Sequence, residues 1–109
     1  MENTVEQLMK AFEEKLQNGT GFVINSALKE LLDSLKSLPE KTQEEYGEKI
    51  ADIVHEQGLK AYDRSDRDRL QALLNCLKTV ENRFNDNEWI LIMVQHLWNK
   101  RTLMPKGRK

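Results

Sequence analysis

Apolar side chains recur along the chain at intervals of three and four residues, the spacing that places them on one face of an α-helix. The pattern is interrupted at four places: the glycines of residues 19–21, Pro39, Gly58 and the Asn-Asp-Asn cluster at residues 85–87. Residues of these types end helices or form turns. The pattern therefore predicts an all-α fold, a compact bundle of four to five helices with no strands.

The first two predicted helices have recognisable ends. Thr4 and Gln7 are spaced as a capping box, so the first helix is expected to begin at residue 3 or 4. Its apolar face ends at Leu16, shortly before glycines that readily adopt the left-handed conformation found at helix ends. The second helix carries apolar residues from Ile24 to Leu38, and the proline that follows is expected to stop it.

The third predicted helix is the least regular. Thr42 is expected to cap its start and Gly58 to end it. Gly47 lies inside this helix, where a glycine costs about 1 kcal/mol relative to alanine. The fourth helix is expected to begin near Ser65 and to carry a leucine-rich face as far as Phe84.

The fifth predicted helix, WILIMVQHLWNK at residues 89–100, has large apolar side chains at eight of its first ten positions. Six consecutive apolar residues are also typical of a buried strand, but a single strand without a partner is unstable, so a helix is predicted. The apolar residues cover more than half of the helix circumference, which is typical of a helix surrounded by others. The simplest expectation is therefore a central core helix.

The first and third predicted helices have narrow apolar faces and short spans, so the bundle is not expected to cover this helix completely. An uncovered apolar area of several hundred Å² is large for a stable monomer. Part of the helix is therefore predicted to contact another chain, most simply a second copy related by a two-fold axis. Trp89 and Ile92 are the expected contact residues, with Lys100 and Arg101 also binding the partner. Trp98 is expected to lie in the core.

The length of 109 residues fits one domain, predicted at residues 1–100, followed by a basic tail at residues 101–109 that is expected to be disordered. Five of the last ten residues are basic, whereas all eighteen acidic residues precede residue 89. The formal net charge of −1 gives the chain as a whole no general attraction to nucleic acid or to an anionic membrane. Nucleic-acid binding would thus depend on local basic clusters.

The sequence favours a cytoplasmic protein. Its single cysteine, Cys76, excludes an intramolecular disulfide. The first residues include several glutamates and lack the uninterrupted apolar stretch of a secretory signal. No apolar run reaches the roughly 18 residues needed to cross a bilayer, so no membrane association is expected.

No combination of residues predicts a catalytic or metal site. His55 and Glu56 begin the H-E-x-x-H motif of zinc metalloproteases, but Leu59 occupies the position of the second histidine. His96 and Cys76 belong to other segments, and a metal site needs three or four converging ligands. Cys76 is expected to be an apolar core residue. The sequence therefore predicts no metal, no cofactor, no small-molecule substrate and no enzymatic activity.

The segment DRSDRDR, residues 63–69, interleaves three arginines with three aspartates. Arginines in such a run can bind phosphates, but the aspartates compete for the guanidinium groups. A solvated helix start with local ion pairs is the simpler interpretation. The candidates for nucleic-acid contact are the basic residues of this segment and of the tail, namely Arg64, Arg67, Arg69, Lys106, Arg108 and Lys109.

These features favour a non-catalytic protein–protein interaction module that docks through the apolar helix at residues 88–101. The module is expected to self-associate or to be a small subunit or adaptor of a larger assembly. The alternative is a nucleic-acid-associated subunit that uses the basic tail and the region from Arg64 to Arg69. Small helical bundles serve many functions, so the fold class alone does not decide between these hypotheses.

Overall fold

The structure, a computed structural model, describes residues 4–104. This part of the chain contains no strand and consists of five helices: α1 (Thr4–Asn18), α2 (Gly21–Leu35), α3 (Glu40–Asp63), α4 (Arg67–Arg83) and α5 (Glu88–Leu103). The predicted all-α bundle is confirmed. Residues 101–103, which the sequence pattern assigns to the tail, belong to α5, and residues 105–109 lie outside the described part of the chain.

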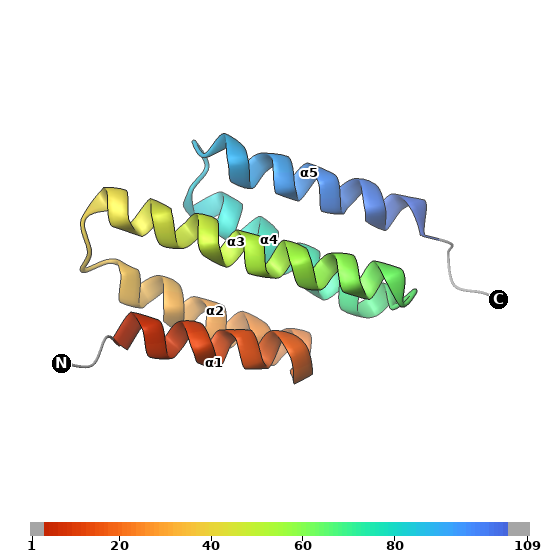
Figure 1. Cartoon of the computed structure of the whole chain (residues 1–109), viewed down its shortest axis with the longest axis horizontal. Helices are drawn as coiled ribbons and strands as arrows, with labels where there is room; N and C mark the ends of the chain where they lie inside the picture. Colours follow the sequence, from red (N-terminus) through yellow and green to blue (C-terminus); the bar gives the residue numbers. More distant parts are fainter. Residues whose placement is uncertain (1–3, 105–109) are drawn as a thin grey trace.

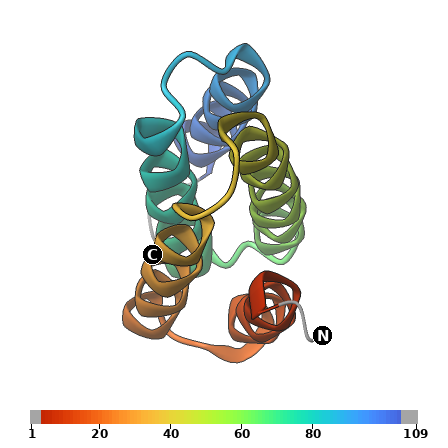
Figure 2. The same ribbon diagram turned by 90° about the vertical axis from the view of Figure 1, so that its left-hand side faces the viewer.

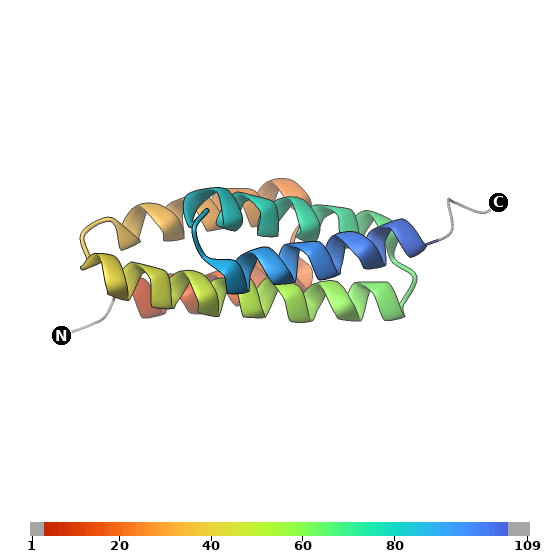
Figure 3. The ribbon, with the colours of Figure 1, turned by 90° about the horizontal axis from the view of Figure 1, so that it is seen from above.

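The five helices are stacked in three layers (Figures 1 and 2). Helices α1 and α2 form one outer layer, and α3 and α4 form the middle layer. Helix α1 packs on α3, and α2 packs on α4. Helix α5 alone forms the third layer and packs against both α3 and α4 (Figure 3).

Side chains that precede three of the helices fix where those helices begin. Thr20, Asp66 and Asn87 each accept a hydrogen bond from a backbone N–H in the first turn of α2, α4 and α5, respectively. Caps of this kind contribute about 1 kcal/mol each. Asn87 is also buried, and its amide nitrogen donates to the carboxylates of Glu44 and Glu48 on α3, at 3.0 and 2.7 Å. The start of α5 is therefore fixed to α3 as well as locally.

Helix α3 differs from the prediction at both ends. It begins at Glu40 and continues to Asp63, so the predicted cap at Thr42 and the predicted end at Gly58 are wrong. Gly58 is buried inside the helix and faces α5. A Cβ at Gly58 would lie 2.7 Å from Cδ1 of Leu97, closer than carbon atoms can pack. The glycine thus allows α3 and α5 to approach each other rather than ending α3.

The expectation that the fifth helix lies in the centre of the bundle is also wrong, because α5 has neighbouring helices on one side only. The physical reason is the layer order. Helices α3 and α4 pack against each other, and α1 and α2 cover their far side, so no helix remains to cover α5. Although α5 is apolar on most sides, neither it nor any other helix within residues 4–104 is both long and apolar enough to cross a membrane.

Replacing Gly58 with alanine tests the close packing of α3 and α5. Alanine gains about 1 kcal/mol in helix propensity, but its Cβ would overlap Leu97, whose side chain is fully buried. Overpacking of a core costs about 1–3 kcal/mol. We expect Gly58→Ala to lower the free energy of unfolding by about 1 kcal/mol, measured by urea denaturation with circular dichroism.

Gly21→Ala is the matched control, because Gly21 also lies in a helix and a Cβ there would make only an ordinary contact of 3.4 Å with Ala72. This variant should be as stable as the wild type or slightly more stable. If Gly58→Ala were equally stable, the close approach of α3 and α5 at this residue would be disproved.

Candidate functional site

Helix α5 buries one side and exposes large apolar side chains on the other. Its inner side packs in the core through Ile90, Met93, Val94 and Leu97. The exposed apolar residues define the outer face of α5: Trp89, Leu91, Ile92, Trp98 and Leu103. Their side chains are between 41 % and 70 % exposed, and the predicted contact residues Trp89 and Ile92 are 50 % and 57 % exposed.

Trp98 corrects the sequence-based prediction, because it is 45 % exposed instead of lying in the core. The cause is the one-sided packing of α5. Leu97, the residue before it, points to the core and is fully buried, and a residue one position along a helix points about 100° away. Trp98 therefore lies at the edge of the helix, beside α4, where Lys78 places its ammonium 5.5 Å from the centre of the indole ring.

The exposed apolar residues of α5 lie in two rows, with the exposed polar residues Gln95 and Asn99 between them. The row beside α3 contains Trp89, Ile92 and Leu103, and the indole nitrogen of Trp89 donates a hydrogen bond of 3.3 Å to Asp52 of α3. The row beside α4 contains Leu91 and Trp98, which are seven residues apart and so share one side of the helix. Each tryptophan thus has one contact with a neighbouring helix, and about half of each residue's surface remains exposed.

The two basic residues that the sequence assigns to partner binding have contacts inside the chain. Lys100 places its ammonium 4.8 Å from the centre of the Tyr62 ring on α3. Arg101 donates from Nε to the side-chain oxygen of Gln71 on α4, at 2.8 Å. Both residues are half-buried. They fasten the end of α5 to the middle layer and lie at the border of the outer face.

His55 of α3 and His96 of α5 form a pair that the sequence does not predict. The Nε2 atom of His55 lies 2.8 Å from Nδ1 of His96, a hydrogen-bonding distance, and the residues are 41 positions apart in the chain. Burial lowers the pKa of His55, His96 lowers it further, and Asp52 acts in the opposite direction. Nothing in the local sequence indicates this pair, because neither histidine belongs to a motif.

The described residues show no site with the ligands of a metal centre. Among residues 4–104, no group of three or more His, Cys, Asp or Glu side chains is arranged to hold a metal ion. Cys76 occupies a buried position, as predicted, and burial raises the pKa of its thiol to about 12. Since the thiolate is the reactive form of cysteine, this residue is chemically inert at neutral pH.

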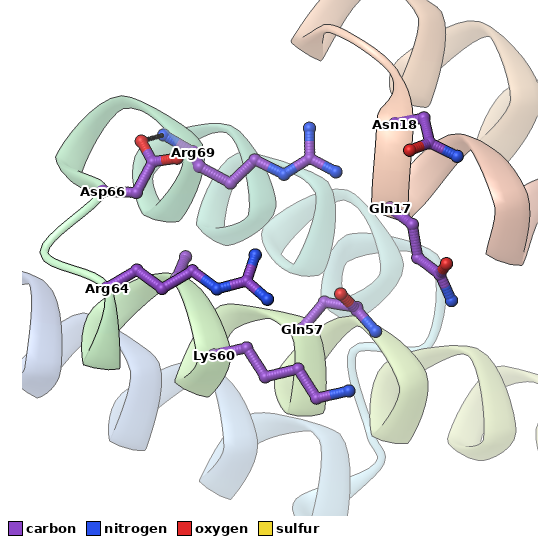
Figure 4. A pocket seen from close by; sticks show the side chains of 8 residues that line it. Gln17, Asn18, Gln57, Lys60, Arg64, Asp66 and Arg69 are labelled. Carbon is purple, nitrogen blue, oxygen red and sulfur yellow. Dashed lines mark hydrogen bonds between the residues drawn. The ribbon is translucent and has the colours of Figure 1, made fainter.

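A cavity of about 510 Å³ lies where the ends of α1 and α3 meet the start of α4 (Figure 4). Lys60, Arg64 and Arg69 supply three cationic side chains to its lining, and Asp66 supplies one carboxylate. Arg64 and Arg69 belong to the predicted nucleic-acid contacts, whereas Arg67 does not line the cavity. Lys106, Arg108 and Lys109, the other predicted contacts, lie outside the described residues.

The predicted ion pairs of the segment at residues 63–69 do not form. All seven residues are described, and no arginine among them pairs with an aspartate. Asp66 instead caps α4 by accepting a 3.1 Å hydrogen bond from the backbone of Arg69. The sequence does contain a signal for the cavity, because Gln57, Lys60 and Arg64 are spaced by three and four residues. The sequence pattern predicts that the helix ends at Gly58, so it does not place these three residues on one helical face.

Comparison with known proteins does not assign the chain to a family. No protein-family model, curated protein or solved structure matches the chain. The functional interpretation therefore depends on two features of the molecule itself, the outer face of α5 and the cavity lined by Lys60, Arg64 and Arg69.

The lowered pKa of His55 predicts how stability changes with pH. The unfolded chain has the ordinary pKa of 6.5 at this residue, so it binds a proton more readily than the folded chain does. His55 therefore contributes stability that is fully present above pH 6.5 and is lost as the pH falls from 6.5 through the lower folded-state pKa.

His55→Gln should remove the pH-dependent stability that His55 contributes, while the other titrating groups of the chain are unchanged. Urea unfolding at pH 7.5 and at pH 5 should show a larger loss of stability for the wild type than for the variant. An equal loss in both proteins would contradict the assigned environment of His55.

Proposed function

We propose that the protein is a non-catalytic interaction module that pairs with a second copy of itself through the outer face of α5. The observation that carries this proposal is the exposure of five large apolar side chains on one helix. Single exposed apolar residues are normal on a protein surface, whereas neighbouring ones mark interaction sites. Tryptophan is also one of the residue types that contribute most to binding at interfaces.

The spacing along the outer face of α5 suits another helix as the binding partner. Positions 89, 92, 96, 99 and 103 are separated by three, four, three and four residues, and carry Trp, Ile, His, Asn and Leu. This is the spacing of the residues that pack between those of a second helix in a coiled coil, and three of these five residues are apolar as that packing requires. A partner helix that lies along α5 would cover Ile92 and Leu103 together.

Two further features favour a second copy as the source of that helix. The third layer of the bundle holds one helix where the other layers hold two, so another α5 would complete it. Helix α5 also has Glu88 in its first turn and Lys100 and Arg101 in its last turn. A two-fold axis across α5 makes the pair antiparallel, so that the acidic start of each helix lies beside the basic end of the other.

The size of the outer face predicts a weak dimer. A stable interface usually buries about 800 Å² on each partner, whereas five half-exposed side chains provide several hundred Å². We expect a dissociation constant on the order of micromolar or higher. Weak pairing of this kind also suits a small subunit or adaptor in a larger cytoplasmic assembly, whose other members would add contact area.

The alternative function, a nucleic-acid-associated subunit, has less support. Arg69 is held by the fold, because its guanidinium donates to the carbonyl of Gly19. The Nε atom of Arg67 is buried and lacks a hydrogen-bond partner among the described residues. Of the three arginines at residues 64–69, Arg64 is exposed, whereas Arg67 and Arg69 are partly buried. These three arginines therefore do not form the extended basic stripe that usually binds a phosphate backbone.

Ile92→Glu tests the role of the outer face of α5. Ile92 is 57 % exposed, so the charge costs little in the monomer, whereas it would be buried without a partner charge in the dimer. We expect the variant to remain folded and monomeric while the wild type dimerises over about 10 to 500 µM. Sedimentation equilibrium measures the oligomeric state of the variant and of the wild type, and circular dichroism shows that the variant is folded.

Phe22→Glu is the matched control, because Phe22 on α2 is 81 % exposed and far from α5 in the stack. It should dimerise as the wild type does. A wild type that stays monomeric over the whole range, or an Ile92→Glu protein that still dimerises, would refute the proposal.

A further inference from the structure

The cavity at the ends of α1 and α3 brings together hydrogen-bond donors and positive charge. Three cationic side chains, those of Lys60, Arg64 and Arg69, line it together with the amides of Gln17, Asn18 and Gln57. In Figure 4 the side chains of Lys60, Arg64 and Arg69 extend in the same general direction, towards the end of α1. They come from α3, from the loop after it and from α4, so the fold and not the local sequence gathers them.

The positive charge in this cavity is not balanced by the protein. Lys60 and Arg64 lie one helical turn apart, a placement in which like charges repel. Within residues 4–104 neither side chain makes a hydrogen bond or an ion pair. Among the described residues that line the cavity, Asp66 is the one acid, and its carboxylate is engaged as the cap of α4. A negatively charged ligand would remove the repulsion between the two cations.

Arg69 supplies a donor that lacks an acceptor. One of its terminal nitrogens, Nη1, donates to the backbone carbonyl of Gly19 and so holds the side chain between α4 and the end of α1. The other, Nη2, is buried with no hydrogen-bond partner among the described residues. Because solvent does not reach Nη2, a ligand in the cavity would contact this nitrogen only after the side chain moves, and otherwise Arg69 contributes its positive charge to the cavity.

We propose that this cavity binds a small molecule that carries a phosphate group. Guanidinium and ammonium groups bind phosphate oxygens through short, charge-assisted hydrogen bonds, and an arginine can contact two oxygens at once. The three amides can donate to or accept from the rest of the ligand. The cavity volume of about 510 Å³ lies within the range of small-molecule sites and exceeds the size of a single phosphate ion.

The charge distribution favours a small anion over a nucleic-acid strand. Residues 1–99 contain twelve basic and eighteen acidic residues, a net charge of −6, so a long polyanion meets repulsion over most of the surface. A small anion inside the cavity interacts mainly with the local cations, because salt screens charges beyond about 8 Å at physiological ionic strength. The site is also separate from the outer face of α5, which lies on the other side of α3 and α4 (Figure 1).

The test uses the full chain and inorganic pyrophosphate as the probe, followed by amide resonances in two-dimensional NMR. We expect saturable binding of one pyrophosphate per chain, with the largest shifts at residues 57–69 and at Gln17 and Asn18. Lys60→Gln and Arg64→Gln should each weaken binding about tenfold, because each removes one charge-assisted contact.

Lys41→Gln is the matched control, because Lys41 is an exposed lysine at the opposite end of α3. It should bind pyrophosphate as the wild type does. The proposal is wrong if pyrophosphate causes no saturable shifts, or if Lys41→Gln weakens binding as much as Lys60→Gln. A short DNA duplex that binds more tightly than pyrophosphate at the same residues, with steep salt dependence, would overturn it in favour of a nucleic-acid site.

Discussion

The packing of Leu97 against Gly58 determines which side of α5 reaches solvent. Gly58 offers no side chain, so the fully buried Leu97 lies close to the backbone of α3. The buried cap Asn87 fixes the start of the same helix to Glu44 and Glu48, and Lys100 and Arg101 fasten its end. With both ends and the middle attached, α5 cannot rotate to bury its remaining apolar residues, and these form the outer face.

This arrangement separates the two candidate sites. The outer face of α5 is apolar and lies in the third layer of the stack, whereas the cavity lined by Lys60, Arg64 and Arg69 is polar and opens between the first two layers. Helix α3 contributes to both, because Asp52 and His55 lie beside α5, whereas Gln57, Lys60 and Ala61 line the cavity. A single 24-residue helix thus supports both candidate sites.

The sequence predicts the five helices well because their apolar spacing is local information. It fails at Gly58, since a glycine can either end a helix or allow another helix to approach, and only the tertiary packing distinguishes these roles. Because of that error, the sequence pattern does not place Gln57, Lys60 and Arg64 on one face of the same helix. The exposure of Trp98 was not predictable for a similar reason: a helix that is apolar on most sides fits a core as well as an interface. The pairing of His55 with His96 depends wholly on the contact between α3 and α5.

The central claim, that the outer face of α5 binds a second copy of the chain, is tested most directly by the NMR spectrum of the wild type at increasing protein concentration. Dimerisation changes the surroundings of the residues in the interface and leaves distant residues unaffected. The account predicts concentration-dependent shifts of the indole N–H signals of Trp89 and Trp98 and of the amides of α5, with no change in α1 and α2. Spectra that do not change with concentration, or shifts centred on α1 and α2, would contradict it.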